Sequence, residues 1–271
     1  MQVYISNNNL ITLASFWEDV ANQSNERFSE EILRKLFVLN YAPNGMWTYF
    51  VSVYFMQNKA ADGSLDDVEF AKFLDKITAF IWTYAVTNPG VNALRTPVYA
   101  EMVNIVNGEP VTFENFKFDL ATVRNAFNNF SFLNGRPITK AMLTWWAFSM
   151  PDQTRFALET PLEIEHIYAR NRNENEHTLT DSRNVELLGN KALLEKKVNI
   201  RASDYRFADK KVFYRGFTNK RGQVKEGTKV VELLELADAK DDFTEADIKA
   251  RNTAILNAFL EFLRANDLAQ M

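Results

Sequence analysis

The chain of 271 residues contains no cysteine, only two histidines, nine glycines and seven prolines. The lack of cysteine excludes disulfide bonds and thiolate zinc sites, so any bound metal must be held by histidine, asparagine or carboxylate side chains. Such ligands favour hard, oxygen-preferring ions such as Mg²⁺. The glycines form no Gly-x-x-x-x-Gly-Lys-Ser/Thr loop, so the sequence offers no recognisable site for nucleotide hydrolysis.

The sequence also lacks any apolar run of the roughly 18 residues that a membrane-spanning helix requires. Its first residues have neither the basic segment nor the apolar segment of a secretory signal. We therefore expect a cytoplasmic protein. Hydrophobic residues make up 46% of the chain and aromatic residues 13%, which is enough for a packed core.

The net charge is only −4, which argues against a protein that coats nucleic acid with its whole surface. The positive charges are nevertheless concentrated, because residues 191–229 contain twelve Lys and Arg against four Asp and Glu. A polyanion would be drawn to this region alone. The alternative is a solvated charged face on an otherwise acidic protein.

Residues 1–150 are predicted to form a helical domain rich in aromatic residues. Ser29 is a plausible cap for one helix and Thr139 for another. The clearest helix lies between Asp66 and Tyr84, where apolar residues recur at helical spacing, and a further helix is expected over Val91–Val106. The aromatic residues of these helices are expected to pack in the core rather than to stack on bases.

The helical period is lost near residue 150, and residues 151–271 form the predicted second domain. Within it, Leu162–Tyr168 and Asn184–Leu188 are predicted to pair as an antiparallel hairpin against a helix over Lys191–Asn199. A final helix is expected over Thr244–Leu263, opened by a capping box. The predicted fold is therefore a predominantly helical α+β protein, with an N-terminal helical domain, a strand–strand–helix core and a closing C-terminal helix.

Polar residues lie where these predicted elements meet. His166 lies near the end of the first strand beside Glu165, and Asn199 ends the following helix. Such a set suits phosphodiester hydrolysis, because His166 could take a proton from water while Glu165 and Asn199 hold a divalent ion at the phosphate. Adjacent residues on a regular strand point to opposite faces, so Glu165 and His166 can share a site only if the strand end is irregular. Glu163 could substitute for Glu165 as an outer-shell ligand.

Simpler roles for these residues remain open. A lone His166 on an apolar strand would be a satisfied core histidine, and His177 is expected to be a solvated loop residue. Asn190, after Gly189, is expected to cap the helix that begins at Lys191.

Taken together, these motifs resemble the HNH (ββα-metal) nuclease domain at the C-terminal end of GmrSD-type restriction endonucleases. The residues that carry the resemblance are Glu165-His166-Ile167, Gly189-Asn190, Leu193-Leu194, Asn199, Phe207, Lys210, Lys211 and Tyr214. The chain departs from the family pattern at Ala169, where the family usually has Pro, and at Lys191, where it usually has Leu.

The resemblance implies a role for each matching residue. It assigns His166 as the general base, Glu165 and Asn199 as metal ligands, and Asn190 as the residue that supports the loop. The implied cofactor is a divalent ion, Mg²⁺ or Mn²⁺, and the implied substrate is DNA. The candidate DNA-binding residues are Lys191, Lys196, Lys197, Arg201, Lys210 and Lys211.

The leading hypothesis is a metal-dependent DNA endonuclease module of a restriction or phage-defence system. The alternatives are a catalytically inert domain of the same fold that binds nucleic acid or protein, and a helical scaffold in which the Glu-His pair is accidental. The resemblance also implies a nucleotide-binding module, on the same longer chain or on a partner subunit, that controls cleavage. We therefore expect only weak nicking by these residues alone, and a solvent-facing His166 whose replacement by Ala leaves thermal stability nearly unchanged.

Overall fold

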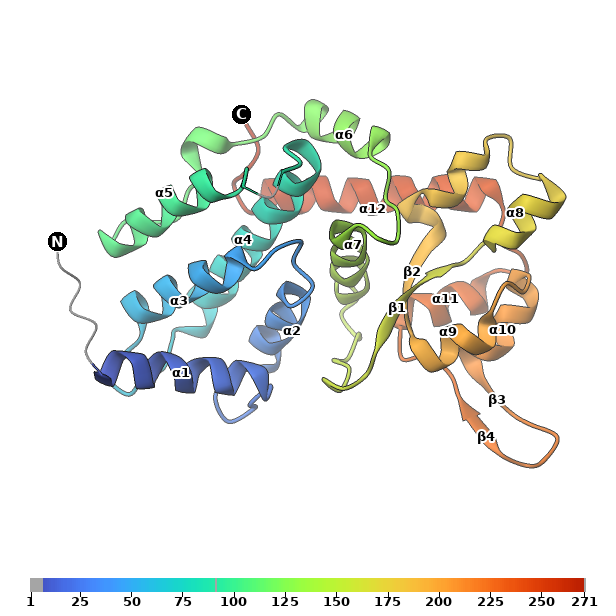
Figure 1. The fold of residues 1–271 in the computed structure, drawn as a ribbon, viewed down its shortest axis with the longest axis horizontal. Coiled ribbons are helices and arrows are strands. Elements are labelled where there is room, and N and C mark those ends of the chain that lie inside the picture. The colour runs from blue at the N-terminus through green and yellow to red at the C-terminus, as the bar shows by residue number, and fades with distance from the viewer. Residues whose placement is uncertain (1–6, 91, 271) are drawn as a thin grey trace. The chain divides into compact units, whose positions relative to one another are not determined.

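The computed structural model describes residues 7–90 and 92–270. Helices dominate, and the strands of the described residues form two small antiparallel sheets, which confirms the predicted α+β class (Figure 1). No helix in this part of the chain combines the length and apolar character of a membrane span.

The chain divides into two compact units. The second unit spans Phe130–Ala258, and the first contains the chain up to Asn129 together with the residues from Phe259 onward. The sequence predicts a division after residue 150, where the helical pattern ends. The helix that precedes residue 150 lies in the second unit, where it packs against a strand.

The first unit is built from helices around an aromatic core. The elements are α1 (Asn7–Ala21), α2 (Glu30–Leu39), α3 (Met46–Asn58), α4 (Asp67–Thr87), α5 (Arg95–Val106), the 3₁₀ helix η1 (Glu114–Phe116) and α6 (Leu120–Asn129). In α4 the predicted apolar stripe is buried, and Phe80 stacks on Phe113 with ring centroids 3.7 Å apart. Both rings are buried, and so are Trp145 and Phe148 of the second unit, which confirms the core role predicted for these two residues, whereas Trp146 is half-buried.

The helix starts of the first unit follow local capping chemistry. Ser29 caps α2 by accepting the N–H of Ile32, and Asp66 caps α4 by accepting the N–H of Glu69. The helix predicted from Val91 begins at Arg95 instead, after a turn, and Val91 itself lies outside the described residues.

The second unit contains all the described strands. Its elements are α7 (Pro137–Phe148), β1 (Leu162–His166), α8 (Arg170–Glu176), the 3₁₀ helices η2 (Ser182–Glu186) and η3 (Leu188–Asn190), β2 (Lys191–Glu195), α9 (Lys196–Ala202), α10 (Phe207–Arg215), β3 (Gly216–Thr218), β4 (Val224–Glu226), α11 (Val231–Ala239) and α12 (Glu245–Ala265), which continues into the first unit. Thr139 lies inside the first turn of α7, and its hydroxyl donates to the carbonyl oxygen of Leu133.

The hairpin predicted next to α9 exists, but its second strand is not Asn184–Leu188. β1 pairs antiparallel with β2, with Leu162 opposite Glu195 and His166 opposite Lys191. Most of the Asn184–Leu188 segment is 3₁₀ helix, because Asp181 caps a tight turn by accepting the N–H of Arg183. The helix predicted to start at Lys191 therefore starts five residues later, after β2.

The prediction that Asn190 caps a helix is wrong. Its side chain instead hydrogen-bonds two loops from inside the protein. Its side chain is fully buried and accepts the N–H of Tyr168 at 2.7 Å. It also donates to the carbonyl oxygens of Tyr168 and Val185, while its own carbonyl accepts the N–H of Ile167. Asn190 thereby supports the loop between β1 and β2.

The last helix covers the turn that precedes β2. The predicted capping box is present, since Asp247 accepts the backbone N–H of Thr244 at 2.8 Å. Gly189 packs so closely on α12 that a Cβ atom there would lie 2.0 Å from the carbonyl oxygen of Ile248. Only glycine fits at this position without moving α12.

We predict that Gly189→Ala lowers the free energy of unfolding by about 3 kcal/mol, because the added methyl group overlaps the backbone of α12. Gly135→Ala is the matched control, since a Cβ at Gly135 meets no atom within 4 Å. It should change stability by less than about 0.5 kcal/mol. Urea denaturation of both variants measures the difference, and equal stabilities would contradict the close packing.

Candidate functional site

His166 ends β1 and lies largely inside the second unit. Only 10% of its side chain is exposed, and its Nε2 is buried 3.7 Å from Oε1 of Glu186. No hydrogen bond to Nε2 is made by any residue within 7–90 and 92–270. The expectation of a solvent-facing ring is therefore wrong, because the end of η2 places Glu186 over it.

Two cations hold the Glu186 carboxylate in place. Lys191 Nζ lies 2.5 Å from its Oε2, and an Arg170 guanidinium nitrogen lies 2.6 Å from its Oε1. The Lys191 ammonium is fully buried and also donates to the carbonyl oxygen of Phe132 and to Oδ1 of Asn134. Lys191 therefore anchors Glu186 beside His166 and does not face a DNA phosphate, which differs from its predicted role.

These charges set the protonation state of the imidazole. Burial lowers the pKa of His166 from its ordinary 6.5 to about 4, and the Lys191 charge adds to this, whereas Glu186 opposes it. Partial burial acts to raise the pKa of Glu186, but the hydrogen bond and charge of Lys191 outweigh it and lower that pKa. At neutral pH the site holds a neutral imidazole beside an ionised carboxylate.

Glu165 lies on the opposite face of β1 from His166. Its Oε1 accepts hydrogen bonds from Lys210 Nζ at 2.7 Å and from the Tyr214 hydroxyl at 2.6 Å, both on α10. Glu165 and Lys210 are 4% and 1% exposed, and burial raises the pKa of the carboxyl. The strand stays regular through His166, so the two neighbours do not share one site. The ammonium of Lys210 already occupies the cation position at Glu165, and it is not available to DNA.

Asn199 of α9 meets Glu163 instead of Glu165. Its Nδ2 donates to Oε2 of Glu163 at 2.8 Å, and the carboxylate of Glu163 is 37% exposed. Lys196 Nζ lies 3.6 Å from the other oxygen of that carboxylate. Within the described ranges, no three His, Cys, Asp or Glu side chains form a metal-binding group.

The remaining predicted DNA-binding residues differ in exposure. Lys211 is mostly covered, and its ammonium donates to the carbonyl oxygen of Lys240. Lys196, Lys197 and Arg201 border a cavity of about 520 Å³ in the second unit. The cavity is lined by Phe156, Ala157, Glu159, Thr160, Pro161, Glu195, Lys196, Lys197, Val198, Arg201, Val224, Lys225, Glu226, Gly227 and Lys229.

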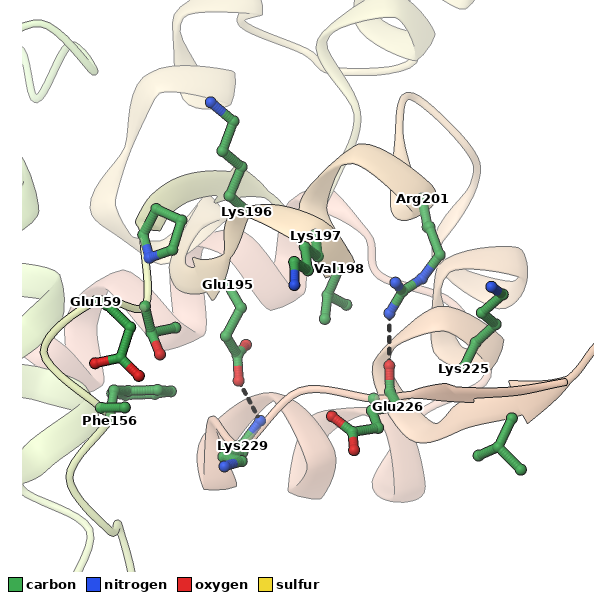
Figure 2. Close-up of a pocket in the computed structure, with 15 residues that line it drawn as sticks. Phe156, Glu159, Glu195, Lys196, Lys197, Val198, Arg201, Lys225, Glu226 and Lys229 are labelled. Carbon is green, nitrogen blue, oxygen red and sulfur yellow. Dashed lines mark hydrogen bonds between the residues drawn. The ribbon is translucent and has the colours of Figure 1, made fainter.

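This cavity, called the basic groove below, lies between α9 and the segment that ends β4, and five basic and three acidic side chains line it. In Figure 2, Arg201 reaches from α9 to the opposite segment, where its guanidinium donates to the carbonyl oxygen of Glu226 at 2.5 Å. Lys197 lies on the same helix, and Lys225 and Lys229 lie on the opposite segment. The groove thus carries cations on both sides.

Comparison with known proteins identifies the family. Residues 118–258, just over half of the chain, match the family model described as GmrSD restriction endonucleases, C-terminal domain. The chain belongs to this family. No curated protein and no solved structure matches the chain. The whole second unit lies in the matched GmrSD region, including His166, Asn190 and Asn199.

The sequence alone did not point to Glu186 or Arg170 as parts of these sites. One signal was present, because Lys191 stands where the GmrSD family usually has Leu. A lysine at a position that is apolar in the family needs a buried partner, and Glu186 is that partner.

We predict that Lys210→Met lowers the free energy of unfolding by about 3 to 5 kcal/mol, because it leaves the buried Glu165 carboxylate without its cation. Adding Glu165→Gln should restore at least about 1 kcal/mol, since the double variant buries no unpaired charge. Urea denaturation of both variants tests this. A Lys210→Met protein as stable as the wild type would show that Glu165 does not depend on the ion pair.

Acidification tests the buried imidazole. The folded pKa of His166 lies below the unfolded value, so the unfolded chain binds the proton first and stability falls as the pH drops from about 6.5 towards about 4. His166 changes the free energy of unfolding by at most about 1.4 kcal/mol per pH unit. This change is measured as the difference between wild type and His166→Gln in urea denaturation from pH 7 to 4.5. Parallel curves for the two proteins would refute the lowered pKa.

Proposed function

We propose that this GmrSD-family chain is an HNH-type endonuclease that hydrolyses DNA phosphodiester bonds with His166 as the general base. The observation that carries the proposal is the neutral imidazole at the end of β1, held beside Glu186 in a family of restriction endonucleases. A neutral imidazole can accept a proton from an attacking water.

The surroundings of His166 favour one tautomer. Because Nε2 faces the Glu186 carboxylate, we assign the ring proton to Nε2, which leaves the lone pair on Nδ1. Nδ1 then takes the proton from the water as the water oxygen bonds to phosphorus, while the bond from phosphorus to the leaving sugar oxygen breaks and that oxygen takes a proton from solvent. Lys191 and Arg170 act through Glu186, because they fix the carboxylate whose Oε1 lies 3.7 Å from Nε2. Asn190 acts indirectly, because it holds the loop that follows β1.

The residues available for a divalent cation are Glu163 and Asn199. Their carboxylate and carboxamide oxygens are hard donors that suit Mg²⁺ or Mn²⁺, and the carboxylate is partly exposed. A cation bound there would neutralise charge on the DNA backbone at the face of β1 opposite His166. The predicted ligand Glu165 fits less well, since it would have to exchange Lys210 for the ion.

The basic groove supports DNA as the substrate. The groove is bordered by Lys197, Arg201, Lys225 and Lys229. Lys196 also borders it, and its Nζ lies 3.6 Å from Oε1 of Glu163. Cations arranged in this way attract the sugar–phosphate backbone regardless of base sequence. The restriction or phage-defence role, and control by a nucleotide-binding module, are further parts of the proposal that rest on the family alone.

We predict that His166→Gln lowers the rate of DNA cleavage by about 10² to 10⁴-fold, the usual contribution of a general base. Glutamine is used because the ring is buried and Ala would leave a void. His177→Gln is the matched control, since His177 is the other histidine and is exposed. The assay is plasmid nicking with Mg²⁺ or Mn²⁺, and a chelator should abolish the cleavage.

Two outcomes would contradict the proposal. If His166→Gln cleaves DNA as fast as His177→Gln, and thermal denaturation shows that both proteins are folded, then His166 is not the general base. No cleavage of DNA by the wild type with any divalent ion, alone or with a nucleotide-binding partner, would favour the alternative of an inert binding domain.

A further inference from the structure

The β3–β4 hairpin forms an arm on the second unit. Figure 1 shows the two strands and their turn projecting away from α9 and α10. α10 packs against β3 at the base of the arm, and Phe213 of α10 contacts Phe217 of β3 with ring centroids 5.5 Å apart. Beyond the base the side chains are exposed, and Val224 is 74% exposed. The arm therefore contributes little to the core.

The base of the arm is built to fix its direction. Gly216 has a φ of +82°, and a Cβ atom on it would lie 2.7 Å from the backbone nitrogen of Gly227. A Cβ atom on Gly227 would lie 2.2 Å from the carbonyl oxygen of Tyr214. These two glycines let the two backbone segments approach closely where the arm leaves the unit.

The tip of the arm is an ordered turn. Asn219 donates its backbone N–H to the carbonyl oxygen of Gln223 at 2.9 Å. Its side-chain oxygen accepts the N–H groups of Arg221 and Gln223, each at 3.0 Å. Lys220 and Arg221 are exposed on this turn. Two cations are thereby presented at a defined point instead of on a loose loop.

The returning strand of the arm forms one side of the basic groove. Glu195 at the end of β2 accepts the Thr228 hydroxyl at 2.5 Å and the Lys229 N–H at 2.6 Å, and Arg201 binds the carbonyl oxygen of Glu226. Glu195 keeps its negative charge, and the groove is lined by five basic side chains, Lys225 among them, against three acidic ones. The arm therefore carries two exposed cations at its tip, Lys220 and Arg221, and its returning strand lines the groove.

We propose that the β3–β4 arm binds the sugar–phosphate backbone of duplex DNA through Lys220, Arg221 and Lys225 and leads one strand into the groove beside α9. The inference deepens the proposed function, on which its choice of duplex DNA rests. A two-stranded ribbon fits a groove of B-form DNA, and each phosphate that a cation neutralises releases counterions. On a chain of net charge −4, such attraction is confined to this surface.

The test is DNA binding by the full chain with Lys220→Gln and Arg221→Gln combined. Fluorescence anisotropy with a 30-base-pair duplex, in chelator so that no cleavage occurs, gives the Kd across salt concentrations. The Kd should rise about 10-fold or more near physiological salt, and the slope of log K against log salt should fall by about 2, one for each lost phosphate contact. Both side chains are exposed, so the melting temperature should not change.

The matched control removes two positive charges from the first unit by combining Lys59→Gln and Lys72→Gln. This protein has the same net charge as the arm variant, so it should keep the wild-type Kd and salt slope if the arm is the contact. Equal losses in both variants, no loss in either, or a loss confined to duplex RNA of the same sequence would each overturn the proposal. A wild type that binds no DNA would overturn it as well.

The outcomes separate this inference from the proposed function. If the wild type binds DNA through the arm but cleaves none under any condition, the arm stands and the nuclease proposal fails. If cleavage depends on His166 while the arm variant binds DNA as tightly as its control, the nuclease stands and the arm proposal fails.

Discussion

The buried guanidinium of Arg251 fixes the turn on which the strand pair depends. From α12 it donates to the carbonyl oxygens of Leu188, Gly189 and Lys191, and it forms a two-point ion pair with Glu232 at 2.5 and 2.7 Å. Leaving buried carbonyl groups unpaired costs about 1 to 3 kcal/mol each. The start of β2, and with it the place of β1, therefore depends on one side chain about 60 residues further along the chain.

This dependence explains which parts of the fold can be predicted from sequence. The helices of the first unit follow from local signals, because Ser29 and Asp66 cap their own helices and the apolar spacing of α4 repeats along one face. The strand β2 does not follow from local signals, because Lys191–Glu195 contains two leucines flanked by charges and fits a helix equally well. Its strand conformation is decided by pairing with β1 and by Arg251, neither of which has a local signal.

The site was predictable in its residue types and less so in its contacts. His166 ends a strand and Asn190 supports the loop, as the sequence and its family resemblance imply. Two of the lysines taken as DNA ligands are buried, because Lys191 has Glu186 and Lys210 has Glu165 as partners. In sequence a buried lysine and a solvated lysine look alike, and only the position of the opposing carboxylate distinguishes them.

The small size of the β1–β2 sheet bears on how the proposed nuclease could act. His166 lies on one face of β1, whereas Glu163, beside Asn199, lies on the other. Among the described residues β1 pairs only with β2, so its second edge has no strand beside it. Glu163 and His166 are three residues apart on β1, which at about 3.3 Å per residue separates them by roughly 10 Å along the strand. We therefore expect the imidazole and the Glu163–Asn199 pair to meet the DNA backbone at different points along the unpaired edge of β1, because the opposite faces of the strand keep them from one phosphate oxygen.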